Sequence, residues 1–232
     1  MEPVRTDNRV SVVIPCYNYA RFLPDCVGSV RDQGSDCDEI IVVNDGSTDD
    51  TSAVCEQLNV TYVRTVNMGE SHARNIGIRL ASSPLIMCLD ADDLLPPGAL
   101  VRLKSMAGVG VVAYGAVSEF GERSRVVSPL AANFYSLFRC NCVYHNAVFH
   151  RSDWEAVGGF DESELMRRGY EDWDFWLRLA ARGVSFRATD SVILCHRVHS
   201  VQQTKVSVDF HREECAAYVR SKHYGKLDRG LI

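Results

Sequence analysis

The first hundred residues alternate short runs of branched apolar residues with stretches in which apolar residues recur at helical spacing. The short runs predict β-strands, and the stretches between them predict the helices of βαβ units in a parallel sheet. The expected strands are 10–14, 39–43, 61–65 and 85–89; the helices between them carry Leu23, Val27 and Val30, then Val54 and Leu58, then Ala73, Ile76, Gly77 and Leu80. Because the run 85–89 is apolar throughout, we expect it at the centre of the sheet.

Two local features refine these boundaries. Pro15 is expected to end the first strand, because proline has no N–H group to donate to a sheet ladder. In the turn after the second strand, Ser47 or Thr48 is the expected N-cap of the next helix, since a hydroxyl can accept a hydrogen bond from an unpaired N–H group.

The second half of the chain has a less regular pattern. The expected elements are helices at 99–106, 172–182 and 209–222, an apolar run at 109–113 and a strand at 191–195. Between 113 and 172 the pattern is irregular and rich in turns, and the last residues of the C-terminal helix are expected to fray. In the helix at 172–182, four apolar residues share one face: Trp173, Trp176, Leu177 and Ala180. We expect a boundary near Met106 that divides one domain into 1–106 and 107–205, followed by a helix and tail at 206–232.

Composition places the chain among ordinary globular proteins. Of its 232 residues, 46% are hydrophobic and 24% are charged, which argues against disorder, and the net charge of −5 gives no reason to expect binding to bulk nucleic acid. The apolar runs are shorter than the ~20 residues of a transmembrane helix, so membrane contact, if any, is expected to be peripheral. Nine scattered cysteines without a secretory signal predict reduced thiols in a cytoplasmic protein. The oligomeric state stays open.

Polar clusters follow three of the predicted strands. They are Pro15-Cys16-Tyr17-Asn18, Asn44-Asp45-Gly46-Ser47 and Asp90-Ala91-Asp92-Asp93. Since the carboxyl ends of parallel strands meet at one edge of a sheet, these clusters are expected to line one crevice. An aromatic ring, a carboxylate and an acidic cluster around one ligand outline a nucleotide site. Neither G-x-G-x-x-G nor G-x₄-G-K-[ST] occurs in the chain, which argues against a dinucleotide dehydrogenase or a P-loop NTPase.

The three aspartates after the fourth strand are the most informative group. Carboxylates this close repel one another, so a cation is expected to neutralise them, and oxygen ligands favour Mg²⁺ or Mn²⁺. If the strand continues, Asp90 and Asp92 point the same way, whereas Asp93 points away and is expected to cap the next turn. The alternative is a solvated acidic loop. The closest group of cysteines and histidines lacks the usual zinc spacing: Cys140, Cys142, His145 and His150.

Six stretches within residues 10–199 carry a resemblance to a known family. They are VSVVIPCYN, EIIVVNDGSTDDT, NMGESHARNIGI, LDADD, GGFDE and YEDWDFWLRLAARG. Together they resemble the inverting, nucleotide-sugar-dependent glycosyltransferases of family 2. The resemblance implies a GT-A fold, an α/β architecture with a Rossmann-like, mostly parallel central sheet flanked by helices and a smaller, irregular acceptor-binding half. It also implies transfer of a hexosyl group from a UDP-sugar with a divalent cation, Mn²⁺ or Mg²⁺, so that 1–106 would bind the donor and 107–205 the acceptor.

Matched position by position, the resemblance implies donor-binding residues in the first half. Pro15 and Tyr17, with Asn18 beside them, would form the wall against the nucleobase, while Asp45 would accept a hydrogen bond from the imide of uracil. A ring stacked on a base stabilises binding by about 1–3 kcal/mol, which suits Tyr17, although ordinary packing is the alternative. Arg74 resembles a nucleotide contact, with a surface ion pair as the alternative.

The resemblance also implies the metal ligands. It assigns Asp90 to the ribose or to the surroundings of the metal, and Asp92 to the metal that bridges the two phosphates. His199 resembles a position that adds a metal ligand or a phosphate contact, and its alternative is a surface histidine. Arg197 could reach the same phosphates, whereas His196 is expected to be structural.

Asp172 is the expected general base. Inverting transfer needs a base on the acceptor hydroxyl, and a carboxylate suffices for this task. Asp172 lies at the start of a predicted helix, where the helix dipole favours its ionised form, and Trp173 and Trp176 would bury that helix. The alternative for Asp172 is an N-cap. Glu171 is the less favoured base and would orient an acceptor or a loop.

Two other functions compete with glycosyl transfer. A phosphatase with D-x-D after an apolar strand would use Asp90 as its nucleophile, but here the motif follows three βα units and Leu94 stands where a small residue or threonine is expected. A sugar-nucleotide-binding protein without activity would not need Asp45, Asp92 and Asp172 together. The transferred sugar stays open. The acceptor is expected to be a saccharide or another glycan precursor, with a natural product, a polypeptide or a modified nucleobase as alternatives.

Overall fold

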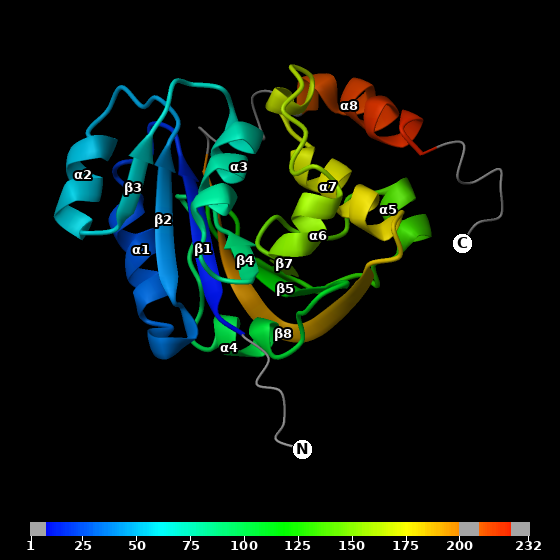
Figure 1. Ribbon diagram of the computed structural model, residues 1–232, viewed down its shortest axis with the longest axis horizontal. Helices are drawn as coiled ribbons and strands as arrows, with labels where there is room; N and C mark the ends of the chain where they lie inside the picture. Colours follow the sequence, from blue (N-terminus) through cyan, green and yellow to red (C-terminus); the bar gives the residue numbers. More distant parts are fainter. Residues whose placement is uncertain (1–7, 200–208, 224–232) are drawn as a thin grey trace.

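A mixed sheet runs through the computed structural model, which describes residues 8–199 and 209–223 (Figure 1). Its strand order is β3-β2-β1-β4-β7-β5-β6, and β8 pairs with β5. The strands are β1 (Val10–Cys16), β2 (Glu39–Asn44), β3 (Thr61–Arg64), β4 (Leu85–Cys88), β5 (Val111–Gly121), β6 (Arg125–Val127), β7 (Val148–His150) and β8 (Ser185–Val198). The helices are α1 (Leu23–Arg31), α2 (Thr51–Leu58), α3 (Glu70–Leu80), α4 (Ala99–Lys104), α5 (Phe134–Arg139), α6 (Arg151–Ala156), α7 (Glu171–Ala180) and α8 (Asp209–Ser221).

The first four strands form the parallel part of the sheet. β1 pairs in parallel with β2 on one side and with β4 on the other, and β3 extends the sheet beyond β2. β4 lies between β1 and the antiparallel β7, so its predicted central position is confirmed. The α/β architecture with a mostly parallel central sheet is therefore as predicted.

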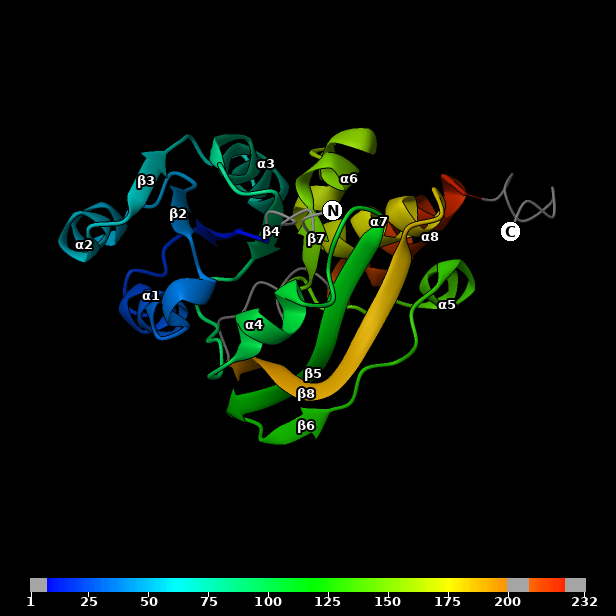
Figure 2. The same ribbon diagram turned by 60° about the horizontal axis from the view of Figure 1, so that its bottom comes forward.

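Alternate residues of the central strands enter two separate apolar clusters. Val13 and Ile86 lie in one cluster, whereas their neighbours Val12 and Met87 lie in the other. Figure 2 shows the helices that complete each layer, with α1 and α4 on one side of β1 and β4 and with α3 and α6 on the other. Because both faces are covered, most residues of the central strands are apolar, which explains why their sequences show runs rather than alternation.

Two of the local predictions are wrong. β1 continues through Pro15 to Cys16, because the pairing of β4 with β1 stops at Val13 and proline is tolerated where one edge of a strand is unpaired. Neither Ser47 nor Thr48 caps α2, whose N-cap is Asp50 without a side-chain cap bond. The turn is longer than expected, because Ser47 N donates to Asn44 Oδ1 at 2.7 Å before the helix starts.

The second half contains far more strand than its sequence indicates. β5 and β8 are 11 and 14 residues long, and Figure 2 shows these two strands running side by side. They were expected only as an apolar run at 109–113 and a strand at 191–195. β8 is mostly half-buried or exposed, and its pairing with β5 shifts register twice near Ala116, so neither strand shows a clean period of two.

The remaining predictions for the second half concern its helices and its boundary. The helices expected at 172–182 and 209–222 are present as α7 and α8, while the fraying expected at the end of the chain falls partly on residues 224–232, outside the described residues. The sheet continues across Met106, and the division into functional halves stays a prediction. Across 8–199 and 209–223, none of the helices is both long and apolar enough to span a membrane.

α3 lies unusually close to the sheet. Ala73, Gly77 and Ile78 are buried, whereas Leu80, expected on the same face, is 51% exposed because the helix ends there. A Cβ atom on Gly77 would lie 2.3 Å from Val13 Cγ1, so only glycine allows this approach. The close packing at Gly77 holds α3 against Val13 of β1 and Val43 of β2.

We expect Gly77→Ala to lower the free energy of unfolding by about 1–3 kcal/mol, because the added methyl group overpacks the contact with β1. Gly28→Ala in α1 is the matched control, since a Cβ atom there meets nothing within 4 Å. The control should raise stability by about 0.5–1 kcal/mol through helix propensity. Urea denaturation of both variants measures the difference, and equal effects would contradict the packing of α3 on β1.

Candidate active site

The polar segments after β1 and β2 are joined to each other. Asn18, in a left-handed conformation with φ 58°, accepts a hydrogen bond from Thr48 N at 2.8 Å, and its own N–H donates to Ser47 Oγ at 3.0 Å. Tyr17 beside it is 46% exposed, while Pro15 is buried within β1. The side chain of Asn18 therefore holds two strand-end loops together, and the ring of Tyr17 is accessible at their edge.

Asp45 fixes the loop that leads into α3. Its carboxylate is only 4% exposed and accepts hydrogen bonds from Met68 N at 2.9 Å and Gly69 N at 2.8 Å. Each carboxylate oxygen has lone-pair capacity beyond one such bond, so these contacts leave room for a further N–H donor. The structure thus brings Asp45 to the strand-end edge predicted for it, where its role toward a nucleobase stays a prediction.

Arg74 lies inside an acidic cluster rather than on the surface. The side chain is 1% exposed; Nη2 lies 2.5 Å from Glu70 Oε1 and 2.9 Å from Asp90 Oδ1, and Nη1 donates to Glu171. The surface ion pair considered as its alternative is therefore wrong. Because Glu171 begins α7 and Asp90 follows β4, this one guanidinium joins three elements of the site.

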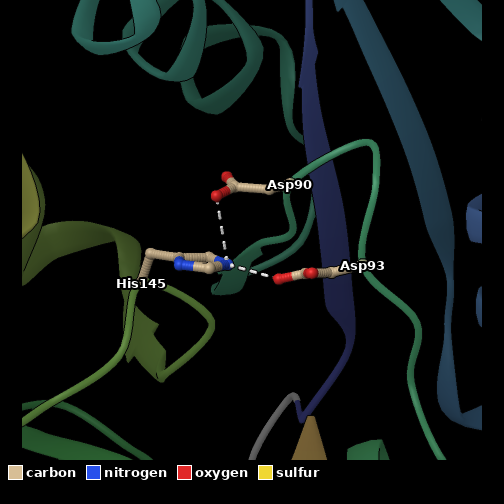
Figure 3. A group of neighbouring side chains, drawn as sticks. All are labelled: Asp90, Asp93 and His145. Atoms are coloured by element: carbon tan, nitrogen blue, oxygen red, sulfur yellow. Dashed lines mark ion pairs between the residues drawn. The ribbon is translucent and has the colours of Figure 1, made fainter. Parts of the chain in front are cut away.

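The three aspartates after β4 have partners supplied by the protein. His145 Nε2 lies 3.4 Å from both Asp90 Oδ2 and Asp93 Oδ2 (Figure 3). Although burial opposes it, the two carboxylates raise the pKa of His145 to about 9. Arg74 and His145 thus neutralise much of the cluster, which weakens the expectation that only a bound cation could do so.

Asp93 does not cap the turn that follows it. Its carboxylate is fully buried, accepts a hydrogen bond from Arg197 N at 2.8 Å and lies 3.0 Å from His196 Nδ1. Both partners belong to β8, so Asp93 ties the end of β4 to a strand that follows it by about a hundred residues. The structural role expected for His196 agrees with this position.

Asp92 and His199, which the resemblance implies as metal ligands, lie against each other, and their roles stay predictions. His199 Nε2 lies 2.9 Å from Asp92 Oδ2, and the Asp92 side chain is 7% exposed. Burial, followed by repulsion from Asp93 and Asp90, raises the pKa of Asp92 to about 6. The Nδ1 atom of His199 is buried without a hydrogen-bond partner among the described residues. The raised pKa means that the Asp92 carboxylate resists ionisation. Carboxylate oxygens and imidazole nitrogens are both metal ligands, so a divalent cation bound here would stabilise the ionised carboxylate.

A second group of side chains has the geometry of a metal site. It contains a histidine that no sequence pattern links to the aspartates. Ligand atoms of Asp90, Asp93 and His145 all lie within 4.8 Å of one another. In the sequence, His145 lies close to two cysteines and 52 residues after Asp93. No local pattern joins it to the aspartates. Its pairing arises because the segment before β7 returns alongside β4.

A cavity of about 480 Å³, called here the main cavity, lies beside this cluster. Of the predicted site residues, Arg74, Asp90 and Asp172 line it, while Pro15, Tyr17 and Asp45 do not. Its wall also includes residues of β5, of the segment before β7 and of the first turn of α7: Tyr114, Glu119, Asn141, Tyr144, His145 and Glu171. The base-side residues and the strand-end loops therefore form separate parts of the site.

Asp172 lies on the wall of the main cavity at the start of α7. It accepts hydrogen bonds from Asn141 Nδ2 at 3.0 Å and from Trp173 N at 2.7 Å. Burial and the neighbouring charge of Glu171 raise the pKa of Asp172 to about 6, so these effects exceed the helix-dipole stabilisation expected from its position. The N-cap of α7 is Tyr170, which rules out the N-cap alternative for Asp172. Trp173 is 3% exposed and anchors the helix as predicted.

The turn at Gly158-Gly159 is anchored by Asn75, a residue that is not among the candidate site residues. Both glycines have positive φ, of 78° and 79°. Asn75 of α3 accepts hydrogen bonds from Phe160 N and Trp154 Nε1 and donates to Phe160 O at 2.9 Å. Trp154 is 7% exposed and belongs to one of the two apolar clusters.

Comparison with known proteins gives an independent view of the chain. Residues 11–158 match the model described as glycosyl transferase family 2, and residues 122–223 match glycosyltransferase like family 2. The glycosyltransferase GlyA of Streptococcus pneumoniae is 35% identical over 170 residues, which cover 71% of this chain and 22% of GlyA. The chain thus spans about a fifth of the length of this relative.

Two solved structures share the fold. One is Staphylococcus aureus TarS 1-349 in complex with UDP-GlcNAc, with a TM-score of 0.72, 16% identity, and coverage of 91% of this chain and 66% of that one. The other is the mannosyltransferase PcManGT from Pyrobaculum calidifontis in complex with GDP-Man and Mn²⁺, with a TM-score of 0.66, 23% identity, and coverage of 95% and 64%. At this identity the likeness concerns the fold, and it agrees with a GT-A architecture.

We expect Arg74→Met to lower the free energy of unfolding by about 3–5 kcal/mol, because it leaves buried carboxylates without their cation. Arg79→Met on the same helix is the matched control: Arg79 is 56% exposed and lies 3.8 Å from Glu162. The control should change stability by less than about 1 kcal/mol. Thermal and urea denaturation test both variants, and a stable Arg74→Met protein would contradict the role of Arg74 in joining α3 to α7.

Proposed function

The chain belongs to glycosyl transferase family 2, and from this premise we propose that it transfers a hexosyl group from a UDP-sugar to an acceptor hydroxyl with inversion of configuration. The observation that carries the proposal is the main cavity, whose wall joins the carboxylate of Asp172 to the Arg74–Asp90 pair. A phosphatase reading of the aspartates does not agree with the family. The acceptor is proposed to be a saccharide or another glycan precursor.

The donor is proposed from the strand-end loops. TarS was solved with UDP-GlcNAc and PcManGT with GDP-Man, so two proteins of this fold hold nucleotide-sugars, which supports a nucleotide-sugar donor here. In this chain the exposed ring of Tyr17 offers a stacking surface worth about 1–3 kcal/mol, and the buried Asp45 offers acceptor oxygens. A carboxylate acceptor suits the imide N–H of uracil, which favours UDP.

A divalent cation is proposed to be held by Asp92 and His199, whose donor atoms lie 2.9 Å apart. The raised pKa of Asp92 supports this assignment, because a bound cation would stabilise the ionised carboxylate. Such a cation, Mn²⁺ or Mg²⁺, would supply Lewis-acid stabilisation to the leaving diphosphate. The protein's own contribution is to keep the two donors together at the end of β4.

Asp172 is proposed to act as the general base in a single displacement. As the acceptor oxygen bonds to the anomeric carbon, its proton passes to a carboxylate oxygen of Asp172, and the bond from that carbon to the diphosphate oxygen of UDP breaks. Attack from the face opposite the leaving group inverts the anomeric configuration, and no covalent sugar–enzyme intermediate forms. Asn141 and the Trp173 N–H hold the carboxylate in one orientation. A pKa of about 6 leaves it ionised at neutral pH while keeping it a competent base.

Asp172→Asn should lower the rate of transfer by about 10²–10⁴-fold, because the amide cannot accept the proton. UDP affinity should stay unchanged, since Asp172 lies apart from the strand-end loops. Asp190→Asn, at an exposed position of β8, is the matched control and should transfer at the normal rate. UDP release from UDP-sugars and calorimetry with UDP measure the two quantities, and normal turnover by Asp172→Asn would remove the base assignment.

The pH dependence of kcat/KM should show an acidic limb near pH 6, with the rate falling about tenfold per unit below it as Asp172 becomes protonated. Glu171 raises this pKa and Arg74 lowers it, and His145 lowers it further. Glu171→Gln should therefore move the limb to lower pH. Glu164→Gln, at an exposed position, should leave the limb in place. An acidic limb at the same pH in the Glu171→Gln variant would contradict the assignment of this limb to Asp172.

A further inference from the structure

The main cavity has walls of opposite charge. Four acidic side chains line one part of it: Glu70, Asp90, Glu171 and Asp172. Arg123 and Arg125, from the β5–β6 hairpin, line another part. The chain as a whole carries a net charge of −5, so a pair of arginines on one cavity wall does not reflect a generally basic surface.

The two arginines are held as a pair by one buried carboxylate. Glu119 is 2% exposed, and its Oε2 lies 2.5 Å from Arg123 Nε and 2.7 Å from Arg125 Nε. Its Oε1 accepts from Nη2 of Arg123 at 2.9 Å and of Arg125 at 3.1 Å. Each guanidinium thus faces Glu119 with its Nε–Nη2 edge, which leaves the Nη1 edge outside these contacts. β-Sheet pairing of Glu119 with Arg125 fixes the arrangement.

This cluster is not balanced in charge. Two guanidinium groups against one carboxylate leave one positive charge, and the arginine side chains are 53% and 55% exposed. One cation is enough to compensate the buried carboxylate of Glu119, so the second, half-exposed arginine is poorly explained as a device that stabilises the fold. Guanidinium groups fixed side by side, with donors still exposed, match the planar oxygens of a phosphate or carboxylate group.

The position of the cluster indicates which substrate it would meet. Of the residues assigned to the nucleotide and the cation, Tyr17, Asp45 and Asp92 do not line the main cavity, whereas Arg74 and Asp90 line it together with the proposed base Asp172. An acceptor hydroxyl must reach Asp172, so the acceptor occupies this cavity. Arg123 and Arg125, on the wall of the same cavity, would then touch the acceptor.

We propose that Arg123 and Arg125, held by Glu119, form an anion subsite for the acceptor, so that the enzyme acts on an acceptor that carries a phosphate or carboxylate group. This inference rests on the proposed function, because it takes Asp172 as the base that faces the acceptor. The proposal specifies the chemical class of the acceptor, which the family assignment leaves open. The two arginines select the acceptor by charge, while Asp172 activates its hydroxyl.

The test uses small anions as probes of the subsite. Glycerol 3-phosphate and glucuronate are titrated into the wild-type protein, with glycerol and glucose as their uncharged counterparts, and binding is followed by NMR. The variant is Arg123→Gln/Arg125→Gln. The matched control, Arg79→Gln/Arg102→Gln, removes the same charge from exposed positions outside the main cavity. UDP affinity of each protein is measured in parallel.

The expected result is anion binding by the wild type that weakens about tenfold or more in the double variant, with UDP affinity unchanged. Loss of glycerol 3-phosphate binding alone would identify the acceptor group as phosphate, and loss of glucuronate binding alone as carboxylate. Equal anion affinity in the wild type and the variant, or no preference for the charged probes, would overturn the subsite. A parallel loss of UDP affinity would also overturn it, because the arginines would then bind the donor.

The experiment distinguishes a failure of the anion subsite from a failure of the proposed function. A wild-type protein that binds the anions through Arg123 and Arg125 but does not bind UDP would contradict the proposed function and keep the anion subsite. If the double variant does not fold, the single variants Arg123→Gln and Arg125→Gln are used. Each should weaken anion binding by about threefold or more, and no change in either would overturn the subsite.

Discussion

The buried guanidinium of Arg74 is the interaction on which the rest of the site depends. It contacts Glu70 on its own helix, Asp90 at the end of β4 and Glu171 at the start of α7. Burying four charges is costly unless their geometry is closely matched, so such a cluster contributes more to specifying one arrangement than to net stability. Because Asp172 follows Glu171, fixing Glu171 also fixes the carboxylate proposed as the base. The two halves of the chain are thereby joined at the point where chemistry is proposed to occur.

Charge is distributed unevenly over the site. Arg74 and His145 neutralise Asp90 and Asp93, which leaves Asp92 with His199 as its one close partner among those described. The demand for an added cation is therefore concentrated at Asp92, the aspartate that the resemblance assigns to the metal. The same uneven distribution continues across the main cavity, where acidic side chains face the hairpin that carries Arg123 and Arg125.

The sequence predicts the parallel half of the fold well, because strands buried on both faces appear as apolar runs and the helices between them keep a regular spacing. Its errors have physical causes. Pro15 is tolerated because one edge of β1 is unpaired there, and β8 was underestimated because much of it is half-buried and shifted in register. The placement of several candidate site residues at strand ends could also be predicted, since strand ends are local features, while the roles of these residues stay predictions. The partners of those residues could not be predicted, because contacts such as Arg74 with Glu171 and His145 with Asp93 span tens of residues and leave no local pattern.

The central claim is that the strand-end loops and the Asp92–His199 pair bind a uridine nucleotide with a divalent cation. Isothermal titration of UDP, GDP and CDP into the purified protein, with and without Mn²⁺, tests it most directly. The account predicts that UDP binds in the presence of Mn²⁺, that the affinity falls when the metal is removed, and that GDP and CDP bind more weakly. Absence of any metal-dependent nucleotide binding would contradict the account.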